Sequence, residues 1–322
     1  MSKIIKRLDI DEILEWFRSG EKNKDDWLIG TEHEKFLFKK KNFQRLKYDE
    51  KCGIRSILEE IATDKDWQPI KEKNHLIGLK NKAGSSISLE PGGQLELSGA
   101  PLKTLHDTCK EAGKHLDLMK KLSEKFNFVI LGIGHDPKSR IDEIDWMPKE
   151  RYKIMKQYMP KVGNLGLDMM IRTCTIQVNL DYSDEDDMIK KFQVALALQS
   201  IATGLFANSP FVDGKNSGFL SKRALVWTDT DFYRTGIPVG VFKEDFGYKS
   251  WLDYLMTVPM YFIYRDGKYI DVSGQKFSDF MLGKLKGLEG VFPTIKDWED
   301  HTTVAFPEVR LKQYLEMRGA DG

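Results

Sequence analysis

Apolar residues recur at helical spacing in three segments of the chain. The first segment follows Asp9, which forms a capping-box pattern with Glu12, and its apolar positions continue to Gly20. Two further stripes have the same spacing: Ile54, Ile57, Leu58, Ile61 and Ala62 form one, and Leu105, Cys109, Ala112, Leu116 and Met119 form the other. Each pattern predicts an amphipathic helix, which buries its apolar face against a flat partner.

Apolar and polar residues alternate in six other segments, which is the period of a β-strand. These strands are the expected packing partners of the helices. The alternation covers residues 28–38, 86–98, 126–133, 169–181, 260–272 and 309–318. In the fifth segment the dipeptide Asp266-Gly267 separates two apolar runs, which predicts a hairpin with a type I′ turn. Because helices and hairpins are mixed without regular βαβ alternation, we predict an α+β fold with a largely antiparallel sheet. Residues 208–248, rich in Gly, Asp and Lys, are expected to form long functional loops.

The composition narrows the class of protein. Lys and Arg number 50 and Asp and Glu 49 among 322 residues, which argues against a surface tuned to nucleic acid or anionic lipid. Three cysteines without a Cys-x-x-Cys spacing are too few for a disulfide framework or a zinc site. The start of the chain lacks the apolar region of a signal peptide, and the least polar run, 194–207, is shorter than the roughly 20 residues of a membrane span. We therefore expect a cytoplasmic protein with neither a membrane segment nor a nucleic-acid partner.

Four of the alternating segments have a polar face with carboxylate, amide or guanidinium groups. In GTEHEKF, Glu32 and Glu34 share one side of the strand, and His33 lies on the other. The same count groups Gln94, Glu96 and Ser98, then Thr175, Gln177 and Asn179, and finally Lys312, Tyr314, Glu316 and Arg318. Glu90 precedes Pro91-Gly92-Gly93, which predicts a turn or bulge, so its side cannot be counted.

One such face alone is explained by a half-exposed strand of an antiparallel sheet. Four together favour a site, because converging carboxylates repel unless cations lie between them, and Mg²⁺ takes oxygen ligands. A multi-magnesium site for phosphoryl transfer needs this set of groups. His33 is interpreted as a packed or hydrogen-bonded core histidine. The chain has no HExxH, no GxxxxGK[ST] and no GxGxxG that opens a helix, so zincin, P-loop and Rossmann sites are not supported.

Seven runs in collinear order carry a resemblance to a known family. They are GTEHEKF, ISLEPGGQLELSGAPLKTLHDTC, MPKVGNLGLDMMIRTCTIQVNLDYS, LFANSPF, WTDTD, VPMYFIYR and FPEVRLKQYLEMRGADG. From about residue 27 to the last residue, the chain closely resembles glutamate-cysteine ligase of the plant and proteobacterial type. Several runs exceed ten residues, which makes chance similarity implausible.

The resemblance implies both a fold and a reaction. The fold is related to that of glutamine synthetase, with a curved, mainly antiparallel sheet that forms a funnel and helices outside it. In the reaction, ATP phosphorylates the γ-carboxylate of L-glutamate, and the amine of L-cysteine displaces phosphate to give γ-glutamylcysteine, the first step of glutathione synthesis. ATP as co-substrate and Mg²⁺ are therefore expected.

The family motifs also imply roles for single residues. Glu32, Glu34, Glu96 and Glu316 match positions of Mg²⁺ ligands, with Glu90 as a plausible addition. Arg318 is the candidate for contacting the transferred phosphoryl group. Gln177-Val178-Asn179 stands where a distant branch has His-x-Asn, so Gln177 is expected to give an amide oxygen to a metal or to bind substrate, and Asn179 to bind substrate.

Further candidates would hold the substrates. Arg172, Arg223 and Arg234 are candidates for binding substrate carboxylates, and the alternative for each is a structural ion pair. Met170 and Tyr254 could line the cysteine side of the pocket. Trp227 could wall the glutamate site, and a purely structural aromatic is the alternative.

The chain departs from the family at its end, because it stops within the GADG motif where the family continues. We therefore expect one catalytic domain over residues 1–322 that lacks the C-terminal part of the family's chain, as a monomer or homodimer. Two alternatives stay open: a carboxylate-amine ligase that joins glutamate to another amine, and a truncated, inactive chain that binds nucleotide or metal. No disulfide is expected at Cys109, and Cys174 is expected to be a buried thiol.

Overall fold

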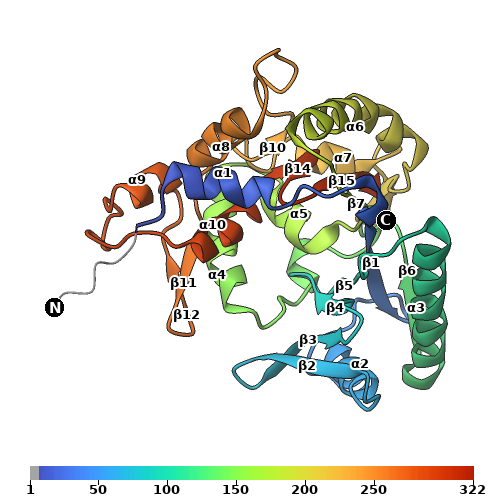
Figure 1. Cartoon of the computed structure of the whole chain (residues 1–322). Helices are drawn as coiled ribbons and strands as arrows, with labels where there is room; N and C mark the ends of the chain where they lie inside the picture. The colour runs from blue at the N-terminus through green and yellow to red at the C-terminus, as the bar shows by residue number, and fades with distance from the viewer. Residues whose placement is uncertain (1–6) are drawn as a thin grey trace.

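An antiparallel sheet runs through the computed structural model, which describes residues 7–322 (Figure 1). Its nine strands within that range have the order β14-β15-β7-β1-β5-β4-β3-β2, and β6 pairs with β1 beside this path. The strands are β1 Ile29–Lys39, β2 Trp67–Glu72, β3 His75–Asn81, β4 Ser86–Leu89, β5 Leu95–Ser98, β6 Phe128–Leu131, β7 Thr175–Leu180, β14 Val309–Leu311 and β15 Leu315–Asp321. The α+β class and the antiparallel sheet predicted from the sequence are confirmed.

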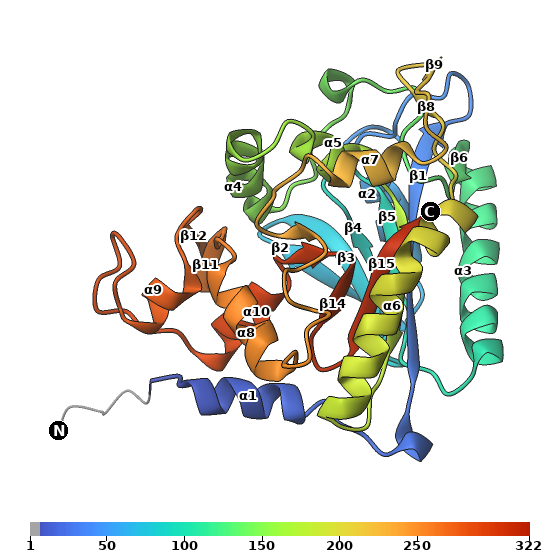
Figure 2. The ribbon, with the colours of Figure 1, turned by 90° about the horizontal axis from the view of Figure 1, so that it is seen from above.

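Strand β1 organises the sheet because three strands pair along its length. Its first residues pair with β7, its middle with β5 and its end, from Phe36 to Lys39, with β6. The sheet turns strongly from β15 to the hairpin of β2 and β3, as Figure 2 shows. Polar side chains of β1, β5, β7 and β15 thereby face the inside of the turn.

Helices cover both faces of the sheet. Helix α3 (Leu105–Phe126) and helix α6 (Glu185–Leu205) lie on the outer face, and α4 (Glu150–Tyr158), α5 (Gly166–Arg172) and α7 (Lys222–Trp227) lie on the inner side (Figure 2). The remaining helices are α1 Ile10–Arg18, α2 Ile54–Ile61, α8 Tyr248–Thr257, α9 Phe277–Met281 and α10 Ile295–Thr302. Two small hairpins, β8 Phe211–Val212 with β9 Lys215–Asn216 and β11 Phe262–Arg265 with β12 Lys268–Asp271, and the pair β10 Thr235–Gly236 with β13 Phe306–Pro307 complete the fold.

Two apolar cores flank the site side of the sheet. One packs α2 and the outer strands β3 to β5, with Ile57, Leu79 and Leu95 fully buried. The other packs α1, α8 and α10 against β14 and the start of β15, around Phe17 and Trp298. A small third cluster holds Cys174, which is buried with a free thiol, as the sequence predicted. Cys109 is also free.

The three helices predicted from apolar spacing are confirmed. Helix α1 begins after the capping box, where the amide of Glu12 donates to Asp9 Oδ1 at 2.8 Å and the amide of Asp9 donates to Glu12 Oε2 at 3.2 Å. The type I′ hairpin is confirmed as well, since Asp266 and Gly267 both have positive φ, 49° and 76°.

Two expectations about elements were wrong, and one hairpin was not expected. Residues 169–172 are helical in α5 and not the start of a strand, and an ion pair between Arg172 and Asp168 one turn earlier stabilises that helix. Residues 309–318 form a hairpin and not one strand, because the chain turns between β14 and β15. The hairpin of β2 and β3 was not predicted, because β2 is exposed on both faces and its sequence does not alternate. Within residues 7–322 the chain has no helix that is both long and apolar enough to cross a bilayer.

Candidate active site

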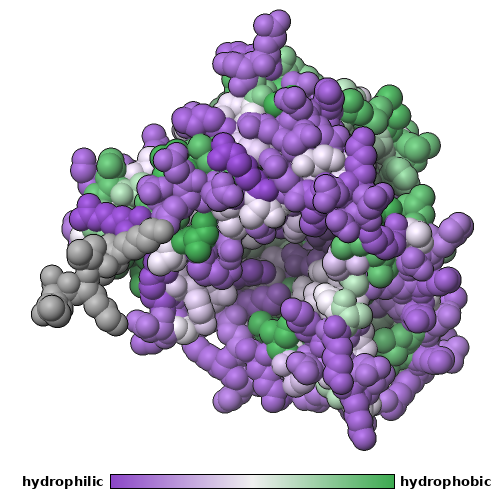
Figure 3. All heavy atoms as spheres, in the orientation of Figure 1, coloured by the Kyte–Doolittle hydropathy of each residue, from purple (hydrophilic) through white to green (hydrophobic). Residues whose placement is uncertain are grey.

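A cavity of about 230 Å³ lies on the inner face of the sheet, between the strands and helices α4, α5 and α7. The space-filling view shows the molecule hollowed between its upper part and the lower β2–β3 part (Figure 3). Strands β1, β5 and β7 contribute the floor, helices α4, α5 and α7 contribute one wall, and residues 303–310 contribute the other. We call this the acidic cavity, because Glu32, Glu34, Glu90 and Glu96 line it.

The register of the strands brings three of these carboxylates together. Glu34 of β1 lies opposite Glu96 of β5, and Glu32 lies opposite Gln177 of β7 on the other side. Because neighbours across an antiparallel pair point to the same face, all of these side chains enter the cavity. Polar neighbours orient them: the amide of Thr175 donates to Glu34 Oε2 at 2.9 Å.

Glu90 reaches the cavity because of the turn that follows it. The amide of Gly93 donates to Glu90 O at 2.8 Å, and Gly93 has φ +82°, a conformation that favours glycine. Gly92 is required for a different reason, since a Cβ there would lie 2.5 Å from Ile171 O. The buried amide of Gln94 fixes the turn to α5 by donating to Met170 O and Thr173 O at 3.2 and 2.9 Å.

The carboxylates disfavour each other's charge. Burial, then Glu316 and Glu96, raise the pKa of Glu32 to about 7. Burial and Glu90 raise the pKa of Glu96 to about 7. Burial, then Glu90 and Glu96, raise the pKa of Glu34 well above its ordinary value. The cavity therefore stores unfavourable charge that a bound cation would relieve.

The four glutamates that line the cavity offer the type of ligand that Mg²⁺ prefers. Among residues 7–322, Glu32, Glu34, Glu90 and Glu96 form no ion pair with a side chain, and carboxylate oxygens are the ligands that Mg²⁺ takes. Their spacing is not that of a closed ligand set, because no three His, Cys, Asp or Glu side chains in the described range are grouped as ligands of one ion.

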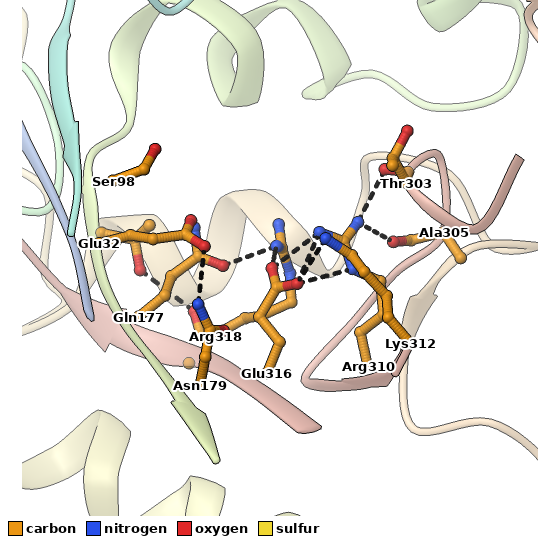
Figure 4. A network of polar contacts seen from close by, with 12 residues as sticks. Glu32, Ser98, Gln177, Asn179, Thr303, Ala305, Arg310, Lys312, Glu316 and Arg318 are labelled. Carbon is orange, nitrogen blue, oxygen red and sulfur yellow. Dashed lines mark hydrogen bonds and ion pairs between the residues drawn. The ribbon is translucent and has the colours of Figure 1, made fainter. Parts of the chain in front are cut away.

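Glu316 differs from the other four carboxylates. It is fully buried and does not line the cavity, because cations surround it (Figure 4). Arg310 binds it through both carboxylate oxygens, with Nη2 to Oε1 at 2.7 Å, Lys312 Nζ lies 3.2 Å from Oε2, and Arg318 forms a further ion pair. Although burial alone would raise the pKa of Glu316, Arg310, Lys312 and Arg318 hold it well below its ordinary value.

Arg318 connects this ion cluster to the acidic cavity. Its guanidinium pairs with Glu316 and also donates to Gln177 Oε1 at 2.6 Å (Figure 4). Burial alone would lower the pKa of Arg318, and the carboxylates of Glu316 and Glu32 raise it. Carboxylates and guanidinium groups thus line the same cavity, with Arg310 and Arg318 coming from β14 and β15, and with Arg151 and Arg223 close to Glu90 and Glu34.

Three further predicted residues line the cavity. Met170 lies on its helical wall. Arg223 and Trp227 of α7 lie together, with the guanidinium 5.7 Å from the ring centroid. Arg223 Nε and Trp227 Nε1 are buried without a hydrogen-bond partner in the described part of the chain, so both donors are free to bind a ligand.

Four predicted residues do not line the cavity. Arg234 is fully buried, and its guanidinium pairs with Asp231 at 2.6 Å and donates to two backbone carbonyl groups. Arg172 pairs with Asp168 and with Asp213, and its Nε is buried without a hydrogen-bond partner in the described part of the chain. Tyr254 packs against Trp251 in the α8 core. Asn179 contacts the acidic cavity only through Glu32, because its side-chain amide donates to Glu32 Oε1 at 3.1 Å.

Several residues that line the cavity were not predicted from the sequence. Arg151, Tyr152 and Met155 come from α4, whose weakly amphipathic sequence was not predicted as a helix. Phe262, Phe306 and Arg310 come from the segments around the β11–β12 hairpin and β14. Arg310 has the same parity as Glu316 and Arg318 when 309–318 is counted as one strand, and the register of the β14–β15 hairpin places it directly opposite Glu316.

His33 lies away from the carboxylates, as the alternation predicted. Its Nε2 lies 3.2 Å from Thr31 Oγ1, and burial, then Lys35, lower its pKa to about 4.

Comparison with known proteins places the chain among close relatives. Residues 28–322 match the family model of glutamate-cysteine ligase family 2. Chloroplastic glutamate-cysteine ligase B of Oryza sativa subsp. japonica is 56% identical over 312 residues, which are 97% of this chain and 62% of the relative. The chloroplastic glutamate-cysteine ligase of Arabidopsis thaliana is 55% identical over 312 residues, 97% of this chain and 59% of the relative. The chain thus spans about three fifths of the length of the curated relatives it matches.

A crystal structure of glutamate-cysteine ligase from Francisella tularensis in complex with AMP aligns with 94% of this chain and 62% of that chain, at 14% identity. Its TM-score of 0.46 is too low to assign a fold.

The relatives correct the cytoplasmic location expected from the sequence, since those named above are chloroplastic proteins. That expectation rested on the lack of an apolar signal segment, a criterion that does not detect amphipathic, Arg- and Ser-rich transit peptides. Family membership itself rests on a match over nearly the whole chain, and the resemblance found in the sequence is confirmed. The chain belongs to glutamate-cysteine ligase family 2.

Proposed function

We propose that this chain carries the active site for ATP-dependent ligation of L-glutamate to L-cysteine, the first step of glutathione synthesis. The observation that carries the proposal is that carboxylates without an ion-pair partner and several guanidinium groups line the same acidic cavity. Glu32, Glu34, Glu90 and Glu96 could bind a cation there, and the arginines, with Arg318 among them, could bind the phosphate groups that the cation carries. Membership of the family supports the same reaction.

The proposed reaction has two steps. A γ-carboxylate oxygen of glutamate attacks the γ-phosphorus of ATP, the bond from that phosphorus to the bridging oxygen breaks, and ADP leaves. The cysteine nitrogen then attacks the γ-carbonyl carbon, phosphate leaves with the attacking glutamate oxygen, and the nitrogen loses a proton as the amide forms. Such a reaction needs positioning and neutralisation of charge more than covalent help.

Glu32, Glu34, Glu90 and Glu96 would hold Mg²⁺ in this proposal. Bound Mg²⁺ would supply positive charge to the phosphate oxygens and fix their orientation. Glu316 contributes differently in the structure, since its ion pairs hold Arg310 and Arg318 in place. We propose that Arg318 faces the transferred phosphoryl group and stabilises its oxygens, with Gln177 orienting the guanidinium.

Arg223 and Trp227 are proposed to hold glutamate. Their buried N–H donors without a partner would bind an anionic or carbonyl oxygen of the substrate. The rings of Trp227 and Phe306 pack against each other, with their centroids 5.9 Å apart, and form one wall of this site. Met170 is proposed to line the cysteine side, where a polarizable thioether suits a thiol.

A coupled assay of ADP release tests the proposal. We expect release from the 322-residue chain only when L-glutamate, L-cysteine, ATP and Mg²⁺ are all present. Replacing cysteine by 2-aminobutyrate or another amine tests the identity of the amine. No release, or release that does not depend on glutamate, would contradict the proposed reaction.

A further inference from the structure

Glu90 enters the acidic cavity from a turn and not from a strand, so the backbone of that turn decides where its carboxylate lies. Strand β4 ends at Leu89, and within the turn the amide of Glu90 donates to Gln94 O at 2.9 Å. The segment before α4 holds the turn from the other side, because the amide of Met147 donates to Pro91 O at 2.8 Å. The position of Glu90 therefore depends on contacts outside the strand ladder.

The carbonyl group of Leu89, directly before Glu90, accepts two side-chain hydrogen bonds. Lys149 Nζ donates to it at 2.7 Å, and the hydroxyl of Tyr152 donates to the same oxygen at 2.9 Å. Lys149 is the residue before α4, and Tyr152 lies in the first turn of that helix. Both side chains are buried, with 7% and 3% of their surfaces exposed. The two donors therefore join the end of β4 to the helix that forms one wall of the acidic cavity.

A lysine at this position carries a cost, because its ammonium is buried without an ion pair in the described part of the chain. Burial, then Arg151, lower the pKa of Lys149 to about 8, while the carboxylates of Glu90 and Glu96 raise it. A neutral donor such as a second tyrosine would bind the carbonyl group with less desolvation. The buried charge lies near the two carboxylates whose placement the turn decides.

We propose that Lys149 is a positioning residue for Glu90. Together with Tyr152 it holds the Leu89 carbonyl group, and it thereby keeps the Glu90 carboxylate in the acidic cavity, where that carboxylate binds a divalent cation. The inference rests on the proposed function, because Glu90 is one of the glutamates that would hold Mg²⁺. Lys149 itself does not line the acidic cavity, so it acts through the turn.

Binding of Mn²⁺ alone tests the inference without nucleotide or turnover. Mn²⁺ takes oxygen ligands as Mg²⁺ does, and the electron paramagnetic resonance signal of the free ion measures its binding. We expect the Kd for Mn²⁺ to rise about tenfold in Lys149→Met. Tyr152→Phe removes the other donor and no charge, so a smaller rise in the same direction separates position from charge. Lys153→Met, at an exposed lysine of the same helix, is the matched control and should bind as the parent chain does.

A double-mutant cycle distinguishes positioning from a general loss of packing. If Lys149 acts through Glu90, Lys149→Met should raise the Kd by less than about twofold when Glu90→Gln is already present. In Glu32→Gln, whose residue lies on β1 outside the turn, the same change should still raise it about tenfold. Melting temperatures report whether each variant folds, and Tyr152→Phe replaces Lys149→Met in the cycle if the latter does not fold.

Equal effects in the two backgrounds would overturn the inference, as would unchanged or tighter Mn²⁺ binding in Lys149→Met. An absence of Mn²⁺ binding by the parent chain would overturn it as well, and the assay of ADP release would then judge the proposed reaction separately. A chain that shows the expected pattern of Mn²⁺ binding and yet releases no ADP would contradict the proposed reaction alone.

Discussion

Glu34 of β1 and Glu96 of β5 lie directly opposite each other in the antiparallel sheet, and both side chains enter the same cavity. Like charges directly opposite each other destabilise an antiparallel pair of strands. The charges of Glu34 and Glu96 therefore affect both the stability of the fold and the proposed binding of a cation. Replacing one of the two glutamates shows which of these effects depends on its charge.

Glu34→Gln should abolish turnover while leaving the melting temperature unchanged or slightly higher. The amide keeps the shape and can still accept the hydrogen bond from Thr175, but it removes a buried charge that Glu90 and Glu96 disfavour. A coupled assay and thermal unfolding of the same sample check this, with the exposed Glu124→Gln as control. Retained turnover with a large loss of stability would show a structural role instead.

Arg318→Lys should reduce turnover by about 100-fold or more, with little change in glutamate binding. A lysine keeps the charge, but it cannot bridge Glu316 and Gln177 with the planar geometry of a guanidinium. Turnover and calorimetric binding of glutamate to the variant separate the two effects. Equal losses in binding and turnover would instead assign Arg318 to substrate binding.

Arg310→Met should destabilise the protein by about 2–4 kcal/mol. The change removes three hydrogen bonds to Glu316 and leaves the carbonyl oxygens of Thr303 and Ala305 without their donor. Urea unfolding measures the loss, and adding Glu316→Leu should recover part of it because the buried charge is removed as well. Arg55→Met, in an exposed ion pair with Glu59, should have little effect. A loss as small as that of the control would show that the ion cluster does not stabilise the fold.

Acidification should destabilise the protein partly through His301. This ring is buried in α10, its Nε2 bonds to Leu255 O at 2.8 Å, and burial lowers its pKa to about 4 from an ordinary value of 6.5. Between these values the unfolded chain binds a proton that the folded chain does not. The contribution of His301 is therefore complete above about pH 6.5 and is lost as the pH falls toward 4, by up to about 3 kcal/mol.

His301→Gln tests this linkage because glutamine does not titrate. The free energy of unfolding of the variant, measured by urea at several pH values, should fall less steeply between pH 6.5 and 4 than that of the parent chain. Parallel curves would show that His301 does not contribute. His33 and His115, whose pKa values are also lowered, to about 4 and about 3, remain in both proteins and cancel in the comparison.

The sequence predicted much of the acidic half of the site, because that half depends on strand alternation. Glu32, Glu34 and Glu96 sit on strands whose parity is preserved in the structure. Glu316 and Arg318 were predicted to share a face with the metal site, but the register of the β14–β15 hairpin places Arg310 opposite Glu316, and Arg310, Lys312 and Arg318 together neutralise the carboxylate. A period of two cannot reveal a turn within an alternating run.

The helical wall could not be predicted for a different reason. Helix α4 has little apolar asymmetry, since one face borders the acidic cavity and another lies toward the β2–β3 hairpin, so both faces carry polar residues. The arginines could not be told apart from the sequence either. Only tertiary packing leaves Arg223 Nε without a hydrogen-bond partner and pairs Arg234 with Asp231.

Isotope transfer from glutamate tests the central claim most directly. L-glutamate labelled with ¹⁸O in both γ-carboxylate oxygens is incubated with the chain, ATP, Mg²⁺ and L-cysteine, and the released phosphate is examined by mass spectrometry. Formation of a γ-glutamyl phosphate predicts one ¹⁸O atom in each phosphate and one in each γ-glutamylcysteine. Phosphate without ¹⁸O would contradict phosphoryl transfer to glutamate in the acidic cavity.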